Sequence, residues 1–191
     1  MNENLGALFD KYGSDKNRNG YSPIYHTILK RIRDSVTNLL EIGIGTMIPH
    51  APSSMVGYSL PGYKPGGSLR AFRDYLPSAC VVGVDVAEDC LFEEDRIKTL
   101  RADSRDATAL ASVLGDSTFD VVIDDGLHTH DAQLATLRNL MQRVRLGGYY
   151  VVEDVYPGSP FLDELPAALL AIRMEPAWFT TAKKNIVIFS L

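Results

Sequence analysis

The stretch Val121-Val-Ile-Asp-Asp-Gly-Leu-His-Thr-His130 places two carboxylates and two imidazoles directly after a run of apolar residues. A second acidic pair, Glu153-Asp154, follows another apolar run. If the two runs are neighbouring strands, they stand about 4.8 Å apart, and Asp125 meets this pair. Carboxylates so close repel one another, and hard oxygen ligands suit Mg²⁺. We therefore predict a divalent cation on Asp125, Glu153 and Asp154; the alternative is an acidic rim neutralised by salt bridges.

A glycine-rich turn and further polar residues stand at the ends of three other apolar runs. The first run ends in Glu41-Ile-Gly-Ile-Gly45, the second in Asp85, and the third in Asp103-Ser104. Glycine lets a ligand approach the backbone, and a carboxylate can accept both hydroxyl groups of a ribose. We expect a nucleoside site formed by Glu41, Gly43, Gly45, Asp85, Asp103 and Ser104. The alternative is a tight turn beside solvated carboxylates.

The turn lacks the glycine spacing of dinucleotide-binding enzymes. Their fingerprint G-x-G-x-x-G opens a helix directly, whereas Ile48 stands at the third glycine position here and Pro49 follows it. The acidic residue expected about 20 residues later is also displaced, because a long loop separates Gly45 from Asp85. A nucleoside ligand without a pyrophosphate, such as S-adenosylmethionine, therefore fits the pattern better.

A largely parallel sheet is needed to bring these residues to one edge. The early apolar runs are continuous, which is typical of strands covered on both faces. We predict a single α/β domain over residues 1–191, with a Rossmann-like, doubly wound, mostly parallel sheet and an antiparallel C-terminal strand. Its seven predicted strands lie within residues 38–45, 81–86, 97–104, 119–124, 149–154, 174–181 and 185–191.

Helices are predicted from capping residues and from apolar residues at helical spacing. Ser22, Ser68 and Asp131 are expected to cap helices, and Gly147-Gly148 is expected to end the last of these three. Two further helices are predicted from residue 106 to 114 and from 163 to 172.

Composition excludes several classes of protein. The 191 residues are 46% hydrophobic and carry a net charge of −5 without a lysine or arginine tract, which argues against a nucleic-acid partner. No apolar run approaches the ~20 residues of a membrane span, and the polar N-terminus does not resemble a signal peptide. Cys80 and Cys90 have neither metal-site spacing nor a disulfide framework. We expect a cytoplasmic protein, and its long apolar loops are compatible with a homo-oligomer.

With these residues the chain resembles class I S-adenosylmethionine-dependent methyltransferases. Leu40-Glu-Ile-Gly-Ile-Gly45 is similar to their first motif, Asp85 to their ribose-binding acid, and Asp103-Ser104 to their adenine-side residues. A narrower resemblance, to metal-dependent O-methyltransferases of the macrolide-sugar type, is carried by K11-Y-G-S-D-K16, G62-Y-K-P-G-G-S-L69, I123-D-D-G-L-H128 and V152-E-D154. Leu127 departs from this narrower pattern, since relatives often carry a small residue there.

This resemblance implies roles for individual residues. His128 would be the general base, for which an imidazole with an ordinary pKa near 6.5 is suited; the alternative is a helix-capping or structural histidine. The metal ligands implied are again Asp125, Glu153 and Asp154. We read His130 as structural or pocket-lining. The cofactor site is further assigned Ser68, Val86 and Asp124, with Tyr12 and Lys16 helping to close it.

The implied function is a Mg²⁺- and S-adenosylmethionine-dependent O-methyltransferase that acts on a hydroxyl group of a sugar-bearing or polar natural product. Residues 1–35 would form an N-terminal helical lid, and residues 46–67 a long active-site loop, unless that loop is a plain surface or an oligomer contact. Two alternatives are a tailoring enzyme of the cephalosporin hydroxylase and methoxylation type and a non-catalytic, nucleoside-binding partner subunit.

Overall fold

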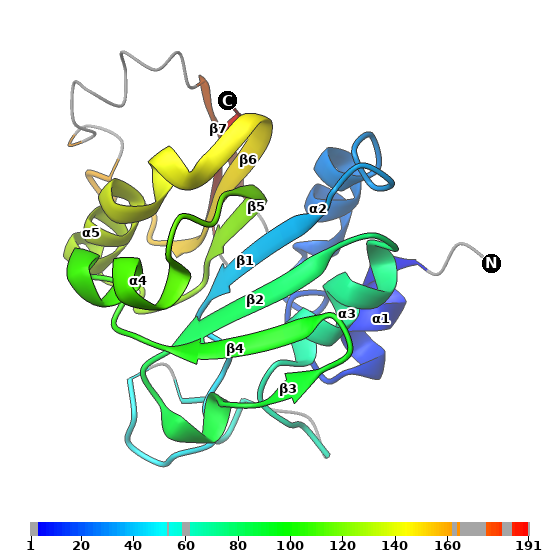
Figure 1. Ribbon diagram of the computed structural model, residues 1–191, viewed down its shortest axis with the longest axis horizontal. Helices are drawn as coiled ribbons and strands as arrows, with labels where there is room; N and C mark the ends of the chain where they lie inside the picture. Colours follow the sequence, from blue (N-terminus) through cyan, green and yellow to red (C-terminus); the bar gives the residue numbers. More distant parts are fainter. Residues whose placement is uncertain are drawn as a thin grey trace.

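The computed structural model describes residues 4–52, 54–58, 62–161, 164, 175–180 and 185–190. Within them one sheet of eight strands, in the order β3-β4-β2-β1-β5-β6-β8-β7, forms the centre of the domain (Figure 1). The strands are β1 (Asn38–Ile42), β2 (Cys80–Asp85), β3 (Glu93–Glu94), β4 (Ile97–Arg101), β5 (Phe119–Asp124), β6 (Val144–Val155), β7 (Glu175–Thr180) and β8 (Asn185–Ser190).

The strand directions confirm the predicted mostly parallel sheet. β4, β2, β1, β5 and β6 pair in parallel, and β8 lies antiparallel between β6 and β7. The predicted count of seven strands was wrong by one, because β3 adds an antiparallel edge to β4. A strand of two residues is too short to show the alternation from which strands are predicted.

Helices cover both faces of the sheet (Figure 1). One face carries α1 (Leu5–Lys11), α2 (Ser22–Leu29) and α3 (Gly67–Tyr75); the other carries α4 (Ala107–Leu114) and α5 (His130–Leu140). Two short 3₁₀ helices, η1 (Glu88–Cys90) and η2 (Met141–Arg143), complete the set for the described residues. None of the helices in this part of the chain is long and apolar enough to cross a membrane.

Alternation along the strands assigns each side chain to one face. Leu39, Val121 and Val151 pack towards α1, α2 and α3. Their neighbours Leu40 and Val122 pack towards α4 and α5. The continuous apolar runs therefore supply two separate cores, as a sheet covered on both faces requires.

The three predicted caps were each wrong by a residue or two. Ser22 is the first residue of α2 and its hydroxyl donates to Asn17. Ser68 lies inside α3, which begins at Gly67, and its hydroxyl donates to Glu41. Asp131 is in the first turn of α5, one residue after the helix begins. Each of the two serine hydroxyls donates its hydrogen bond to another side chain and does not cap its helix.

The predicted end of α5 was also wrong. Gly147 and Gly148 lie within β6, because the helix ends at Leu140 and Val144 already pairs with Phe119 of β5. A Cβ atom on Gly148 would lie 2.5 Å from the carbonyl oxygen of Asp120, so this glycine serves strand packing. The predicted helix over residues 163–172 and the turn over 182–184 fall outside the described residues, apart from residue 164.

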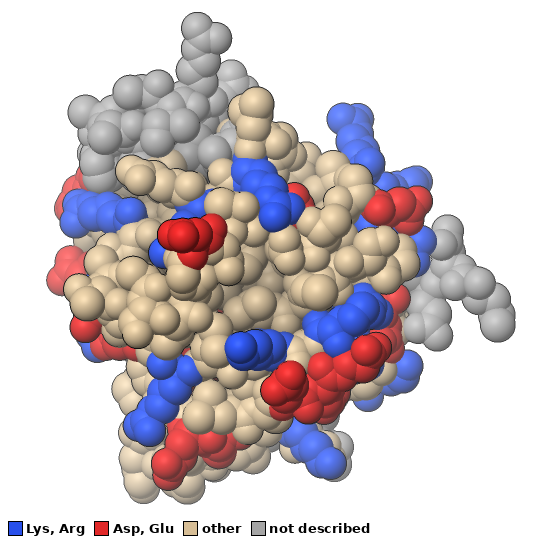
Figure 2. Space-filling view, viewed as in Figure 1, with Lys and Arg blue, Asp and Glu red and all other residues tan. Residues whose placement is uncertain are grey.

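The described charges on the face drawn in Figure 2 are mixed. Lysine and arginine side chains alternate with aspartate and glutamate and form no continuous basic surface among the described residues on this face. A protein that binds the nucleic-acid backbone relies on clustered cations, so this face offers no such footprint.

We predict that the turn after β1 is intolerant of a side chain. Gly43 has φ +82°, and a Cβ there would lie 2.1 Å from the carbonyl oxygen of Asp125. Gly57 has a similar φ of +87° but open space around it. In urea unfolding, Gly43→Ala should lose about 3 kcal/mol or more, and Gly57→Ala about 1 kcal/mol. Equal losses would contradict the close approach of the two chain segments.

A second prediction concerns Asp124, the last residue of β5. Its side chain is buried on the α4 and α5 side, one oxygen has no hydrogen-bond partner among the described residues, and burial raises its pKa to about 8. The folded state therefore holds a proton that the unfolded state releases near pH 4. Stability from this group is complete below pH 4 and is lost as the pH rises towards 8.

Urea unfolding between pH 5 and 8, with EDTA present, tests this proton. Asp124→Asn should remove up to about 1.4 kcal/mol per pH unit of the wild-type slope. Asp120→Asn, in the same strand, is the control, since the pKa of Asp120 is lowered and the group does not titrate in this range. If wild type and Asp124→Asn had the same slope, Asp124 would be ionised in the folded protein.

Candidate active site

A cleft of about 260 Å³ lies at the carboxyl ends of the parallel strands. Residues of the N-terminal segment and of the loop after β1, among them Asp15, Met55 and Tyr58, also line it. The predicted site residues that line this cleft are Lys16, Gly43, Gly45, Ser68, Asp85, Val86, Asp103, Ser104, Asp125, His128, Glu153 and Asp154.

Close packing against other parts of the chain requires glycine at positions 43 and 45 in the turn after β1. A Cβ on Gly45 would lie 2.1 Å from the hydroxyl oxygen of Tyr63. That hydroxyl donates to the carbonyl of Gly45 at 2.9 Å, and Gly43 is packed against the backbone of Asp125. We expected these glycines to make room for a ligand; the observed close contacts are with the chain, although both glycines also line the cleft.

The acid at the end of β2 orients the turn. One oxygen of Asp85 accepts from the backbone N–H of Ile44 at 2.8 Å, and the other accepts from that of Ala87 at 2.9 Å. Each carboxylate oxygen has a second lone pair, so Asp85 retains capacity to accept hydroxyl groups from a ligand in the cleft.

The two residues predicted to border the adenine, Asp103 and Ser104, already have partners within the protein. Asp103 forms a two-point ion pair with Arg105, with contacts of 2.9 and 2.6 Å. The hydrogen bond from Arg105 lowers the pKa of Asp103. The hydroxyl of Ser104 lies 2.8 Å from that of Thr136 in α5. The charge of Asp103 is therefore already paired with that of Arg105, and its contact with adenine stays a prediction.

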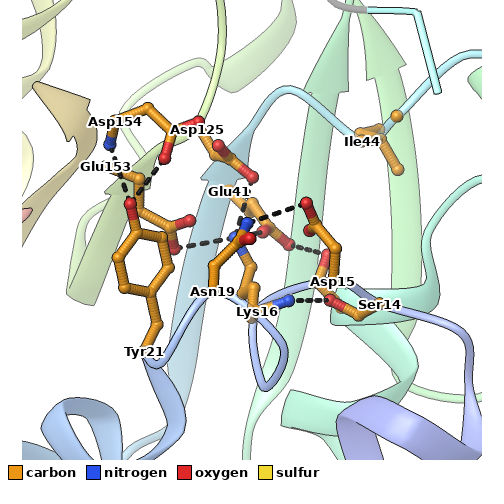
Figure 3. A network of polar contacts seen from close by, with 12 residues as sticks. Ser14, Asp15, Lys16, Asn19, Tyr21, Glu41, Ile44, Asp125, Glu153 and Asp154 are labelled. Carbon is orange, nitrogen blue, oxygen red and sulfur yellow. Dashed lines mark hydrogen bonds and ion pairs between the residues drawn. The ribbon is translucent and has the colours of Figure 1, made fainter. Parts of the chain in front are cut away.

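A lysine from the N-terminal segment lies among three carboxylates (Figure 3). The Nζ of Lys16 is 3.1 Å from Glu41, 2.8 Å from Asp125 and 2.7 Å from Glu153. Its side chain is only 1% exposed. Burial by itself lowers the pKa of Lys16, but the three carboxylates outweigh burial and raise the pKa well above its ordinary value. The lysine is therefore a permanent buried cation.

A second group of ligand atoms shares Asp125. The Nε2 of His128 is 3.8 Å from Oδ1 of Asp125 and 3.4 Å from Oδ2 of Asp154. One ligand atom from each of these three residues lies within 4.8 Å of the others, a spacing that could hold a metal ion. Glu153, predicted as a ligand, is not in this group; it lies with Lys16 and accepts from the hydroxyl of Tyr25.

A break in β6 explains how the adjacent acids Glu153 and Asp154 reach the same side. Asp154 has φ +56°, and the pairing with β8 shifts register between Val152 and Val155. Its side chain accepts from the hydroxyl of Tyr21 at 2.5 Å, within the same layer that holds Lys16 (Figure 3). Strict alternation would have turned one of the two acids away from the cleft.

Three residues assigned to the cofactor do not line the cleft. Tyr12 donates to Asp74 at 2.5 Å, Glu41 is buried beneath Lys16, and Asp124 faces the opposite side of the sheet. The adjacent residues Asp124 and Asp125 therefore point to opposite faces of the sheet. His130, read as structural or pocket-lining, also lies outside the lining and contacts Glu164 at 2.9 Å.

Sequence reasoning missed several residues of the site. Tyr21 and Tyr25 donate to Asp154 and Glu153, and Asp15 and Asn19 line the cleft. The motif K11-Y-G-S-D-K16 was the available signal for this segment, but it did not indicate which side chains turn towards the sheet.

No protein-family model matches the chain. Among curated relatives, a tetracenomycin-rhamnoside 3'-O-methyltransferase of Streptomyces olivaceus is 37% identical over 80% of this chain and 37% of its own length. Demethylmacrocin O-methyltransferase of Streptomyces fradiae is 34% identical over 78% of this chain and 34% of its own length. The chain thus spans little more than a third of these relatives.

Solved structures agree with these relatives. The methyltransferase MycE of the mycinamycin pathway, in complex with Mg and SAH, matches 100% of this chain and 55% of its own, with a TM-score of 0.75 and 25% identity. A third curated relative, mycinamicin VI 2''-O-methyltransferase of Micromonospora griseorubida, is 32% identical over 71% of this chain and 31% of its own length. The chain therefore has the class I S-adenosylmethionine-dependent methyltransferase fold and is a homologue of the sugar O-methyltransferases of antibiotic pathways.

Proposed function

We propose that this protein transfers the methyl group of S-adenosylmethionine to a hydroxyl group of a sugar-bearing or otherwise polar natural product, with Mg²⁺ as the metal. The observation that carries the proposal is the Asp125, His128 and Asp154 group, which stands in a cleft beside the turn after β1. The names of the relatives, which are sugar O-methyltransferases, support it.

The cofactor would lie along the carboxyl ends of β1, β2 and β4. Gly43 and Gly45 expose backbone to the cleft, and Asp85 has lone pairs for the ribose hydroxyls. Asp103 and Ser104 would border the adenine. The SAH bound in MycE supports this choice of nucleoside.

The donor set fits a hard divalent cation. Asp125 and Asp154 offer carboxylate oxygens, and Glu153 stands next to them with one oxygen engaged by Lys16. Oxygen ligands are those that Mg²⁺ takes, and MycE was solved with Mg bound. When bound, the cation would make a hydroxyl group more acidic and would help to orient it.

His128 would accept the proton of the acceptor hydroxyl. Its side chain is 26% exposed to the cleft, and its Nε2 faces the carboxylates of Asp125 and Asp154. His128 lines the same cleft as the carboxylates proposed to hold the metal. The residue therefore combines access to the acceptor with a place beside the proposed metal site.

Further predictions concern the whole protein. We propose a small-molecule acceptor, no nucleic-acid partner and a cytoplasmic location, and a homo-oligomer remains a prediction. The net charge of −5 and the small-molecule substrates named for the relatives support the first two points.

The function is tested with S-adenosylmethionine that carries a deuterated methyl group, Mg²⁺ and a panel of glycosylated acceptors. Label should appear in the product, and His128→Ala should lower turnover by about 10²- to 10⁴-fold while calorimetry finds S-adenosylhomocysteine affinity nearly unchanged. His26→Ala is the control, because His26 is exposed and pairs with Tyr75 outside the cleft.

Turnover that survives in His128→Ala would exclude this residue as the base. A product that gains oxygen without labelled methyl would favour the hydroxylase type of chemistry. If the wild-type chain does not bind S-adenosylhomocysteine, the proposal is contradicted.

We also predict that Lys16 is essential for folding. Lys16→Met would leave the buried Glu41 and Glu153 and the partly buried Asp125 without their cation, and removal of one partner of a buried charge cluster costs about 3–5 kcal/mol. Urea unfolding measures the loss, with Lys64→Met as the control because Lys64 is exposed. Equal stability of the two variants would show that the carboxylates do not depend on the lysine.

A further inference from the structure

The proposed cofactor carries a charged group for which no residue has yet been identified. The amino-acid end of S-adenosylmethionine has an ammonium group, and a charge removed from water needs an opposite charge or several hydrogen bonds. The side chains assigned so far would serve only the ribose and the adenine. A carboxylate in the cleft that is not already paired would supply the opposite charge.

Most of the carboxylates that line the cleft already have partners in the protein. Asp85 accepts from two backbone N–H groups, and Asp103 is paired with Arg105. Asp125 and Glu153 share Lys16, and Asp154 accepts from Tyr21 and faces His128. The described acidic residues that line the cleft are Asp15, Asp85, Asp103, Asp125, Glu153 and Asp154.

Asp15 differs from the other five. One of its oxygens accepts from the side-chain amide of Asn19 at 2.8 Å, which is a neutral donor. Its carboxylate forms no ion pair with any described lysine, arginine or histidine, and its side chain is only partly buried. A negative charge thus faces the cleft with its second oxygen available.

The position of Asp15 suits the amino-acid end of the cofactor. Asp15 lines the same cleft as Gly43 and Gly45, the two glycines of the turn after β1. Tyr63 and Asp125, which are in close contact with these glycines, line it as well. Figure 3 shows the carboxylate of Asp15 beside the amide of Asn19, next to the group of carboxylates around Lys16.

The segment that carries Asp15 is held in place by the backbone. The N–H of Ser14 donates to Phe9 at 2.9 Å, that of Asn19 to Asp15 at 2.8 Å, and that of Tyr21 to Lys16 at 2.9 Å. Lys16, the next residue, is fixed among its three carboxylates. A side chain held in this way binds a ligand with little loss of conformational entropy.

We propose that Asp15 binds the ammonium group of the methionine part of S-adenosylmethionine, an inference that rests on the proposed function. It also revises the role of Lys16, whose Nζ is fully engaged and cannot serve the carboxylate of the same ligand. Asp15 is a binding residue, and Lys16 is the positioning residue beside it.

The competing explanation is that Asp15 only shapes its turn through Asn19. Asp15→Asn separates the two, because an amide oxygen can still accept from Asn19 while the charge is gone. The matched control is Asp10→Asn, since Asp10 accepts from Asn17 at 2.7 Å in the same manner but is exposed and outside the cleft.

The experiment is calorimetric titration of the full chain with two nucleosides. S-adenosylhomocysteine has the amino-acid group, and 5′-methylthioadenosine lacks it. Asp15→Asn should weaken S-adenosylhomocysteine about 10- to 100-fold, the range of a lost charged hydrogen bond, and leave 5′-methylthioadenosine unchanged. Asp10→Asn should change neither affinity. Asn19→Ala, which keeps the charge, should retain the preference for S-adenosylhomocysteine.

Two results would overturn the inference. Unchanged affinity of Asp15→Asn for S-adenosylhomocysteine would show that the charge is not used, and an equal loss for both nucleosides would show a purely structural role. If wild type binds neither nucleoside, the proposed function itself fails. Wild-type binding with an unaffected Asp15→Asn variant overturns only the assignment of Asp15.

Discussion

The buried ammonium group of Lys16 is the interaction on which the arrangement of the site depends. Its three carboxylate partners come from β1, from the residue after β5, and from β6. Glu41 and Glu153 are buried and Asp125 is partly buried, and without a cation the mutual repulsion of their charges would add to the cost of desolvation. The lysine thereby ties the N-terminal segment to the strands that form the cleft.

The face to which each acid is directed decides what it can do. Asp124 and Asp125 are adjacent, yet one is sealed beneath α4 and α5 and the other reaches both Lys16 and His128. Glu153 and Asp154 are adjacent as well, but the left-handed residue in β6 keeps both on the cleft side. Asp124 and Asp125 thus lie on opposite faces of the sheet because β5 is regular at its end. Glu153 and Asp154 lie on the same face because β6 is broken.

Much of the architecture could be predicted because it follows from local patterns. Continuous apolar runs identify buried parallel strands, and polar residues at their ends must meet at one edge of the sheet. The predicted caps failed where a serine hydroxyl found a partner elsewhere in the fold, as Ser68 did with Glu41. The contact between Lys16 and Glu153 joins residues 137 positions apart, and no local pattern could reveal it. The break at Asp154 likewise depends on the pairing of β6 with β8.

The separation of Lys16 from its partners also has a consequence for the order of folding. The lysine is made first, but its acids follow in three stages, and the last of them comes with β6. Contacts between distant parts of a chain form slowly, because loop closure must precede them. Charge balance in the cluster is therefore reached only when β6 joins the sheet. An emerging chain has no formed ligand site before that moment, and ligand binding can stabilise only the completed domain.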